Sequence, residues 1–501
     1  MNNLVIYELL QGFIQSGIDK KSQVYHLVKR HFSKEFEVDK EPTEIEFGDI
    51  PKSINNFTAN NFAEIIQDSI LTFANGYPKG QVLGQKYYEC HKQLFLAEIL
   101  NTLLLKRAAL FVAEQLVKKS KKYFFINITF QAYRIMYVTR VSLKGDHKDL
   151  EASENFLKYL KFYEIEKNME IEYNHVFKKL IKSTAFDEEV IHSCGEIIEK
   201  YRQYEKNIPS FYFHYQLYHL DYVRHVNLKE NERVYSIAKN ALEYFDSLHF
   251  VYNPGRLVFM YILIIHSIQH REFDEGQALI ERAKEIVSKK SPQWFRIKEN
   301  ELILNFHRGY FTEAINTFLD VANNKSFVSI NPTDKSRWIL NEAYVNLAIE
   351  TGSGECNVRR KRFSVQKFIN ELPGYSKDKR AMNIPILIAQ MVFFIVRRQY
   401  NHAIDRIEAL EKYSSRYLRN DETFRSNCFI KMLLEIPKNS FNRLRVERAS
   451  QKYFERLIDS EVDLINQPFE IEIIPYERLW AMIMNHLRAD HHYTPKKTRA
   501  A

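Results

Sequence analysis

The hydrophobic positions of this chain recur at helical spacing over most of its length. Apolar runs such as Leu257–Ile268 and Ile384–Val396 are bounded by Asn, Pro or Gly, which end one helix and begin the next. The run Pro468–Tyr476 (PFEIEIIPY) alternates briefly, but prolines bound it, so we expect an extended connection there. The pattern therefore predicts an all-α protein.

Turn residues predict where the helices begin and end. Break signals lie at Lys144–His147, Ile208–Ser210, Asn253–Gly255 and Ser291–Pro292. The sequence NPTD at Asn331–Asp334 is expected to cap a further helix.

With 501 residues, the chain is too long for one compact core. We expect an N-terminal helical region at 1–80 with a loop near 35–57, followed by a helical array at 85–330. A C-terminal array at 331–488 contains an irregular basic insertion near 350–363, and residues 489–501 form a flexible basic tail. The first 80 residues either fold separately or cap the array.

Three segments share one pattern of residues. They are Arg271–Ile286, Gly309–Asn324 and Arg398–Tyr413. Each has an aromatic residue at a turn and a small residue three positions later, namely Phe273 and Gly276, Phe311 and Ala314, and Tyr400 and Ala403. Apolar residues four and seven positions after the small residue lie on the same helix face. The small residue lets the preceding helix approach closely, although a small residue near the crossing point is also found in other helical hairpins.

This pattern resembles the second helix of the tetratricopeptide repeat (TPR) family. The resemblance implies an α-solenoid of stacked antiparallel helix pairs. The match is partial, because the first-helix glycine of the family falls on Ile264, Leu302 and Met391 and the closing proline on Ser288, Ser326 and Ser415. The long interval from Ala314 to Ala403 requires an insertion, which Glu350–Phe363 can supply. Half-matches at Ala109–Lys119 and Val234–Phe245 suggest the same architecture upstream.

Composition narrows the class of protein. The apolar fraction is 45% and the charged fraction 27%, as in ordinary globular proteins. The net charge of +9 permits an acidic partner but does not require one. Four scattered cysteines (Cys90, Cys194, Cys356 and Cys428) form no zinc or redox motif and indicate reduced thiols. The apolar runs are too short to span a membrane, and the N-terminus lacks a secretory signal. We expect a cytoplasmic protein.

Catalytic motifs are absent from the sequence. His266 and His270 form HxxxH, but Ser267 stands where a zinc protease has Glu, and no third ligand is evident. The glycine-containing loops at 78–86 and 352–355 lack the ending of a phosphate-binding loop. We therefore expect no enzyme activity, no catalytic residues, no cofactor and no metal.

Two groups of residues are candidates for binding a partner. Phe211–Val226 is rich in Tyr, Phe and His, which either pack between helices or line a concave face; the candidates there are Tyr215, Tyr218, His219 and Tyr222. Of three basic clusters, Lys118–Lys122 suits a helix end, and Pro495–Arg499 lies in the tail. The third, in the insertion, comprises Arg359, Arg360, Lys361 and Arg362.

We accordingly expect a non-catalytic scaffold that binds a peptide or protein segment in the concave face of a helical array. The alternative is a nucleic-acid-associated helical protein whose basic insertion contacts phosphates. Neither reading requires a membrane.

Overall fold

The computed structural model describes residues 82–143, 148–182, 188–356, 362–371, 380–417, 424–460, 462, 464 and 472–489. Within these ranges the protein is all-helical, with no strand and one isolated bridge between Asn442 and Arg488. This confirms the all-α part of the predicted fold class. The predicted N-terminal helices, their loop and the basic tail lie outside the described residues.

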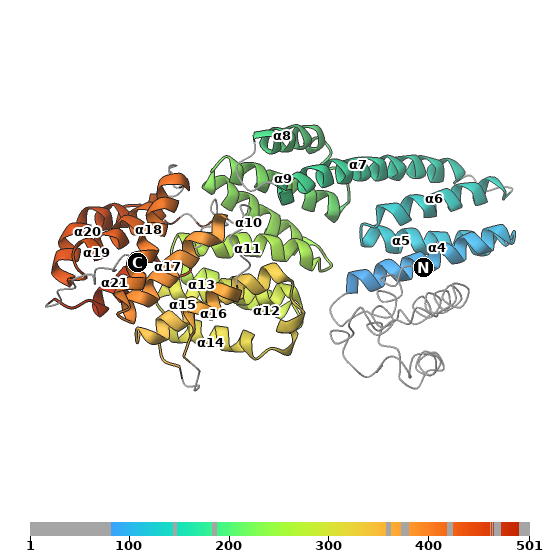
Figure 1. Cartoon of the computed structure of the whole chain (residues 1–501). Coiled ribbons are helices and arrows are strands. Elements are labelled where there is room, and N and C mark those ends of the chain that lie inside the picture. Colours follow the sequence, from blue (N-terminus) through green and yellow to red (C-terminus); the bar gives the residue numbers. More distant parts are fainter. Residues whose placement is uncertain are drawn as a thin grey trace, which may run out of the picture. The chain divides into compact units, whose positions relative to one another are not determined.

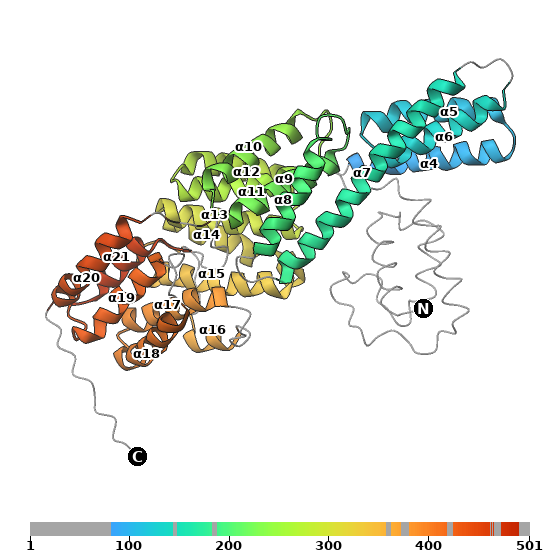
Figure 2. The same ribbon diagram turned by 90° about the horizontal axis from the view of Figure 1, so that it is seen from above.

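Two compact units divide the chain. The described part of the first unit begins with three helices that pack against one another, α4 (Val82–Thr102), α5 (Lys106–Lys122) and α6 (Ile126–Val141), as Figures 1 and 2 show. It also contains α7 (Asp149–Lys182) as far as His175, then Ile197–Leu217 and Phe245–Tyr252. Those segments include the end of α8 (Glu188–Arg202) and the start of α9 (Phe211–Asn227).

The second unit holds Val176–Glu196, the α9 residues from Tyr218 onward and the remaining helices. They are α10 (Asn231–Ser247, as far as Tyr244), α11 (Asn253–Gln269), α12 (Phe273–Glu285), α13 (Pro292–Arg308), α14 (Phe311–Ala322), α15 (Pro332–Glu350), α16 (Val365–Glu371), α17 (Arg380–Val396), α18 (Tyr400–Tyr417), α19 (Phe424–Lys438), α20 (Arg443–Ile458) and α21 (Tyr476–His486). Helices that follow one another pack in pairs, α11 with α12, α13 with α14, α17 with α18 and α19 with α20. None of the described helices is long and apolar enough to cross a membrane.

Six of the described connections between helices share one backbone turn. A residue with positive φ, between 57° and 90°, lies one or two residues after the end of the first helix, at Leu104, Phe124, Lys229, Arg271, Gly309 and Arg398. The next N–H donates to the carbonyl oxygen five residues earlier, at 2.7–3.0 Å, and the second helix begins one residue later. This left-handed ending satisfies carbonyl groups that the helix itself leaves free.

The turn places a buried residue at the same point of each following helix. Its fourth residue is Ala109, Thr129, Val234, Gly276, Ala314 or Ala403, and each is buried. At Gly276 an added Cβ would lie 2.5 Å from Oγ of Ser267 and 2.7 Å from Cδ1 of Leu304. The sequence predicted this close approach at the three clear copies, and the structure shows the same turn at both upstream half-matches.

Before α17, which pairs with α18, the described part of the gap between the second and third copies contains two further α-helices, α15 and α16. As predicted, Asn331 caps α15 by accepting a hydrogen bond from Asp334 N at 2.9 Å, and Ser291 caps α13 in the same way. The insertion begins by packing on α14, because Glu355 N donates to Oγ1 of Thr312 at 3.1 Å. Residues 357–361 of the insertion lie outside the described part of the chain.

Candidate functional site

The first of the four α9 candidates, Tyr215, packs inside a cluster of tyrosines in the first unit. Its ring centroid is 6.5 Å from that of Tyr212 and 6.2 Å from that of Tyr252. A hydrogen bond with Tyr173 and burial both act on the pKa of its phenol, and burial prevails and raises it. These contacts fit packing between helices.

The other three α9 candidates, Tyr218, His219 and Tyr222, belong to the second unit and are half-buried. Tyr218 contacts the rings of Tyr244 and Phe259, with centroids 6.0 and 6.1 Å away. The ring of His219 lies 6.0 Å from that of Tyr222. Burial lowers the pKa of His219 to about 4, so this imidazole is neutral at pH 7 and presents no positive charge.

Tyr222 lies near two residues that the sequence did not single out, Tyr261 of α11 and Arg296 of α13. Burial raises the pKa of both phenols, to about 12 for Tyr261, and the positive charge of Arg296 opposes that rise in both. The Tyr261 hydroxyl donates to the carbonyl oxygen of Gln293 at 3.2 Å. Arg296 is exposed and both tyrosines are half-buried. Arg296 is thus within electrostatic reach of both phenols, and we call these three residues, which come from three helices, the Tyr222–Arg296 face.

Helix α13 is enclosed by its neighbours, and most of its buried charges are paired. Lys298 forms ion pairs with Glu301 at 2.8 Å and with Asp320 of α14 at 2.9 Å. Glu299 accepts a hydrogen bond from Nε of Arg337 of α15 at 3.0 Å. These contacts stabilise the packing of α13 and leave little charge of either sign uncompensated there.

Asn300 differs from those neighbours. Its side chain is 8% exposed, and its Nδ2 is a buried donor without a hydrogen-bond partner among the described residues. Arg296, Asn300 and His307 follow one another on α13 at spacings of four and seven residues, which places them on one helix face. Lys298, which contacts α14, lies on the opposite side. An unpaired donor therefore lies one turn from the exposed cation.

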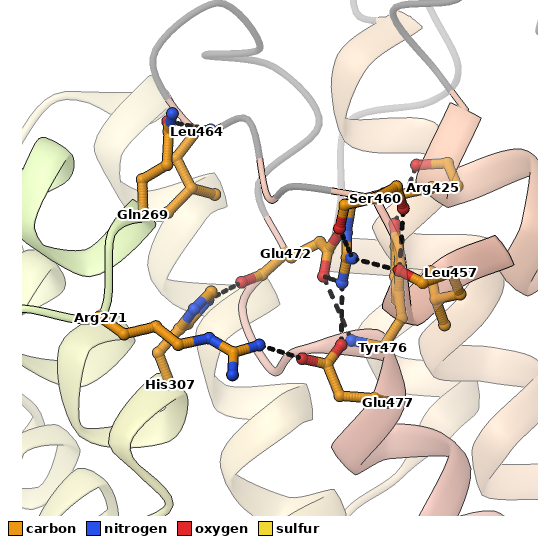
Figure 3. Close-up of polar contacts among 11 residues, drawn as sticks. Gln269, Arg271, His307, Arg425, Leu457, Ser460, Leu464, Glu472, Tyr476 and Glu477 are labelled. Carbon is orange, nitrogen blue, oxygen red and sulfur yellow. Dashed lines mark hydrogen bonds and ion pairs between the residues drawn. The ribbon is translucent and has the colours of Figure 1, made fainter. Parts of the chain in front are cut away.

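The C-terminal end of this α13 face contacts a non-helical segment of the same unit (Figure 3). Nε2 of His307 donates to the carbonyl oxygen of Glu472 at 2.6 Å, and Oε1 of Gln269 accepts from the main-chain N–H of Leu464 at 3.1 Å. Val462, Leu464, Ile473 and Ile474 are buried. Of the predicted extended run 468–476, residues 472–475 are described and are neither helix nor strand.

A buried ion-pair network fixes the same segment to the last helices (Figure 3). Nε of Arg425 donates to Glu472 at 2.6 Å, and its Nη2 donates to Glu477 at 2.8 Å. Nη1 donates to the carbonyl oxygens of Leu457 and Ser460, both at 2.7 Å. Because the guanidinium joins α19, the end of α20 and the start of α21, we assign the network a structural role.

Residues of the Ser, His and carboxylate types also meet in the first unit. Oγ of Ser210 donates to the Glu166 carboxylate and accepts from Phe213 N at 3.0 Å, so it caps α9. The ring nitrogens of His214 face the main-chain carbonyl oxygens of Ser210 and Glu205, at 2.6 and 3.0 Å. The imidazole is therefore turned toward carbonyl groups and away from the serine hydroxyl, an arrangement unlike a catalytic triad.

The two histidines of the HxxxH pair lie side by side at the C-terminal end of α11. The rings of His266 and His270 stack with centroids 4.1 Å apart, and Tyr235 stacks on the other side of His266 at 4.2 Å. Within the described ranges, no group of three or more His, Cys, Asp or Glu is placed to hold a metal ion.

The basic clusters are only partly described. Arg359, Arg360 and Lys361 lie outside the described residues, and Arg362 is exposed. The cluster Lys118–Lys122 ends α5, as predicted. There, Lys119 pairs with Glu89 at 2.6 Å, and the Nζ atoms of Lys121 and Lys122 lie 5.8 and 5.7 Å from the ring centroids of Tyr159 and Tyr123.

Among the described residues, the Tyr222–Arg296 face combines accessible aromatic surface, a free cation and a neighbouring unpaired donor. The sequence predicted only part of this face. The aromatic run of α9 indicated Tyr222, but Tyr261 lies inside an apolar run and Arg296 is an isolated basic residue, so neither was singled out. No local pattern in the sequence links these three residues of α9, α11 and α13. No family model matches the chain, and no curated protein or solved structure is significantly similar to it.

Proposed function

We propose that this chain is a non-catalytic interaction scaffold, built as a TPR-like array of helix pairs, that binds a peptide or protein segment. The observation that carries this proposal is the Tyr222–Arg296 face. Half-buried tyrosines and arginine are the side chains that contribute most binding energy in protein interfaces. Helical repeat arrays offer extended binding surfaces without catalytic groups. The recurring turn and its buried fourth position support the repeat architecture.

A photocrosslinking experiment tests this proposal. A photoreactive phenylalanine analogue at position 222 of the full chain should capture one defined protein from the cells that make it. The same analogue at Tyr137, a similarly accessible tyrosine of the first unit (37% exposed), is the matched control and should not capture that protein.

The captured protein is then purified and its affinity measured by calorimetry. Tyr222→Ala and Tyr261→Ala should each weaken binding about tenfold or more, because truncating a central aromatic anchor removes 2 kcal/mol or so. Tyr137→Ala should leave the affinity unchanged. Equal capture from positions 222 and 137, or equal affinity of all variants, would contradict the scaffold proposal.

The nucleic-acid alternative stays a prediction that rests on Arg359–Arg362. It requires oligonucleotide binding that weakens with salt and disappears when all four residues become Ala. A mobility shift measured at low salt decides it, and the absence of any shift would exclude this alternative.

A further inference from the structure

Helix α20 presents a row of positively charged side chains along one of its faces. Arg445, Arg448, Lys452 and Arg456 follow one another at spacings of three, four and four residues, and all four are exposed. At 3.6 residues per turn they lie within about 80° of the helix circumference and extend about 17 Å along its axis. We call these four residues the α20 stripe. Other residues separate them in the sequence, so only the helix aligns them.

The charge of the α20 stripe is not compensated within the described part of the chain, where no acidic side chain forms an ion pair with any of its members. The two acids of α20, Glu447 and Glu455, lie outside the stripe, and Glu455 accepts a hydrogen bond from Nε2 of Gln451 at 2.9 Å. On the neighbouring helix α19, by contrast, the exposed Lys438 pairs with Glu435 at 3.1 Å. The stripe is therefore a surface of free positive charge.

A fifth cation, Lys431, comes from α19, which packs against α20 (Figures 1 and 2). Its Nζ is 5.8 Å from the ring centroid of Tyr453, and Nζ of Lys452 is 4.7 Å from the same centroid. This half-buried ring thus has two exposed ammonium groups beside it. Because like charges repel, an anion bound near both would relieve their repulsion. Helices α19 and α20 together therefore form a surface suited to anions.

The spacing of the charges indicates which kind of anion fits. Neighbouring cations of the stripe are about 4.5 to 6 Å apart along the helix axis. An extended peptide advances about 3.3 Å per residue, so it would need an acid at almost every second position to match them. A nucleic-acid backbone carries one negative charge at every nucleotide, and it releases condensed counterions when Lys and Arg neutralise its phosphates. A nucleic-acid strand therefore matches the stripe whatever its sequence.

We propose that the α20 stripe and Lys431 bind the phosphate backbone of a nucleic-acid strand. Binding is independent of base sequence, because contacts to phosphate carry no sequence information. The surface differs from the Tyr222–Arg296 face and from the basic insertion, and the proposal does not depend on the scaffold function. It adds a second class of partner to this chain.

Fluorescence anisotropy with a labelled single strand of about 15 nucleotides, a length within the site sizes of single-strand-binding proteins, tests this on the full chain. Four or five phosphate contacts should make the logarithm of the dissociation constant rise with the logarithm of the salt concentration at a slope of about 3. At low salt, the double variant Arg448→Glu with Lys452→Glu should bind about tenfold more weakly or worse. Its unfolding midpoint should be unchanged, because both side chains are exposed.

The matched control is the double variant Arg233→Glu with Lys239→Glu. It makes the same change in net charge at two exposed positions on different faces of α10. This variant should bind the strand as the original chain does. Equal losses in the two double variants would show that only net charge matters and would overturn the proposal.

Three other outcomes would also overturn it. The first is no binding at low salt, or a salt slope below about 1. The second is binding that is lost when Arg359–Arg362 become Ala but kept in the α20 variant, which would place the strand on the insertion. The third is a labelled oligoglutamate of similar length that binds as tightly as the strand, which would make the partner an acidic peptide. Capture from position 222 is a separate readout, so the scaffold proposal is judged independently of all these outcomes.

Discussion

Two buried glutamines of the second unit differ in whether their amides have partners. Gln390 on α17 is 0% exposed, and neither its Nε2 nor its Oε1 has a hydrogen-bond partner among the described residues. Gln269 on α11 is 9% exposed and accepts from Leu464 N at 3.1 Å. A buried amide without a hydrogen-bond partner destabilises a fold. Removing one partner of an existing buried hydrogen bond leaves the other group unpaired and destabilises the fold in the same way.

Met has nearly the shape of Gln without its polar ends, so the two positions should respond with opposite sign. We expect Gln390→Met to raise the free energy of unfolding by about 1 kcal/mol and Gln269→Met to lower it by about 1–2 kcal/mol. Urea unfolding can be followed by tryptophan fluorescence, because Trp294, Trp338 and Trp480 all lie in the second unit. A loss of stability in Gln390→Met would show that an ordered water satisfies its amide.

The elements of the fold could be predicted where their signals are local. A cap such as Asn331 and an aromatic–small pair such as Phe311 and Ala314 act within a few residues, so the sequence alone indicated them. Thr129 and Val234 occupy the same buried position after the same turn, but they are not small. Sequence therefore identified only part of the repeating geometry, since the backbone turn accepts residues as different as Gly309 and Phe124.

The buried guanidinium of Arg425 joins the start of α19 to the end of α20 and the start of α21. At the scale of elements, we expect the loss of this side chain to have the strongest effect on stability. Arg425→Met should lower the free energy of unfolding of the second unit by about 3–5 kcal/mol, because it leaves the buried Glu472 carboxylate uncompensated. Urea unfolding monitored by tryptophan fluorescence measures it. The double substitution of Arg425→Met with Glu472→Gln should recover part of the loss, since the buried charge is then removed.

Lys438→Met on the same helix provides the control for Arg425. Lys438 pairs with Glu435 at 3.1 Å, and its side chain is 59% exposed. Exposed ion pairs contribute at most about 1 kcal/mol, so this variant should unfold almost as the original chain does. Equal losses in the two variants would mean that Arg425 stabilises the unit only through general packing.

At the scale of the whole molecule, long-range packing decided what the sequence could not show. Arg425 lies 47 residues from Glu472 in the sequence, and His307 lies 165 residues from it. No local sequence pattern therefore predicts either contact. The same holds for the candidate site, where Tyr222, Tyr261 and Arg296 come from three helices. Helical spacing predicted each helix separately, but their adjacency required the three-dimensional packing.

Burial also keeps several histidines neutral, and this makes the stability of the molecule depend on pH. Burial lowers the pKa of His214, His219, His266 and His307, to about 4 for His307. The unfolded chain takes up protons below about pH 6.5, whereas the folded chain does not until the lower pKa is reached. His219 and His307, whose pKa values are lowered to about 4, therefore make stability fall as the pH falls from about 6.5 to about 4, and His214 and His266 act in the same direction. Glu166 and Glu472 act in the opposite direction, because burial raises their pKa values.

A single substitution isolates the histidine contribution. For His307 alone, a pKa lowered to about 4 corresponds to about 3 kcal/mol between pH 6.5 and 4. His307→Gln keeps an N–H that can donate to the Glu472 carbonyl oxygen but cannot take up a proton. The free energy of unfolding of the original chain should therefore fall relative to that of this variant as the pH is lowered. Urea unfolding followed by tryptophan fluorescence at each pH measures this difference. His192→Gln, at a side chain that is 74% exposed, is the control and should follow the original chain throughout. A constant difference between the original chain and His307→Gln from pH 6.5 to 4 would show that the buried imidazole does not contribute to acid sensitivity.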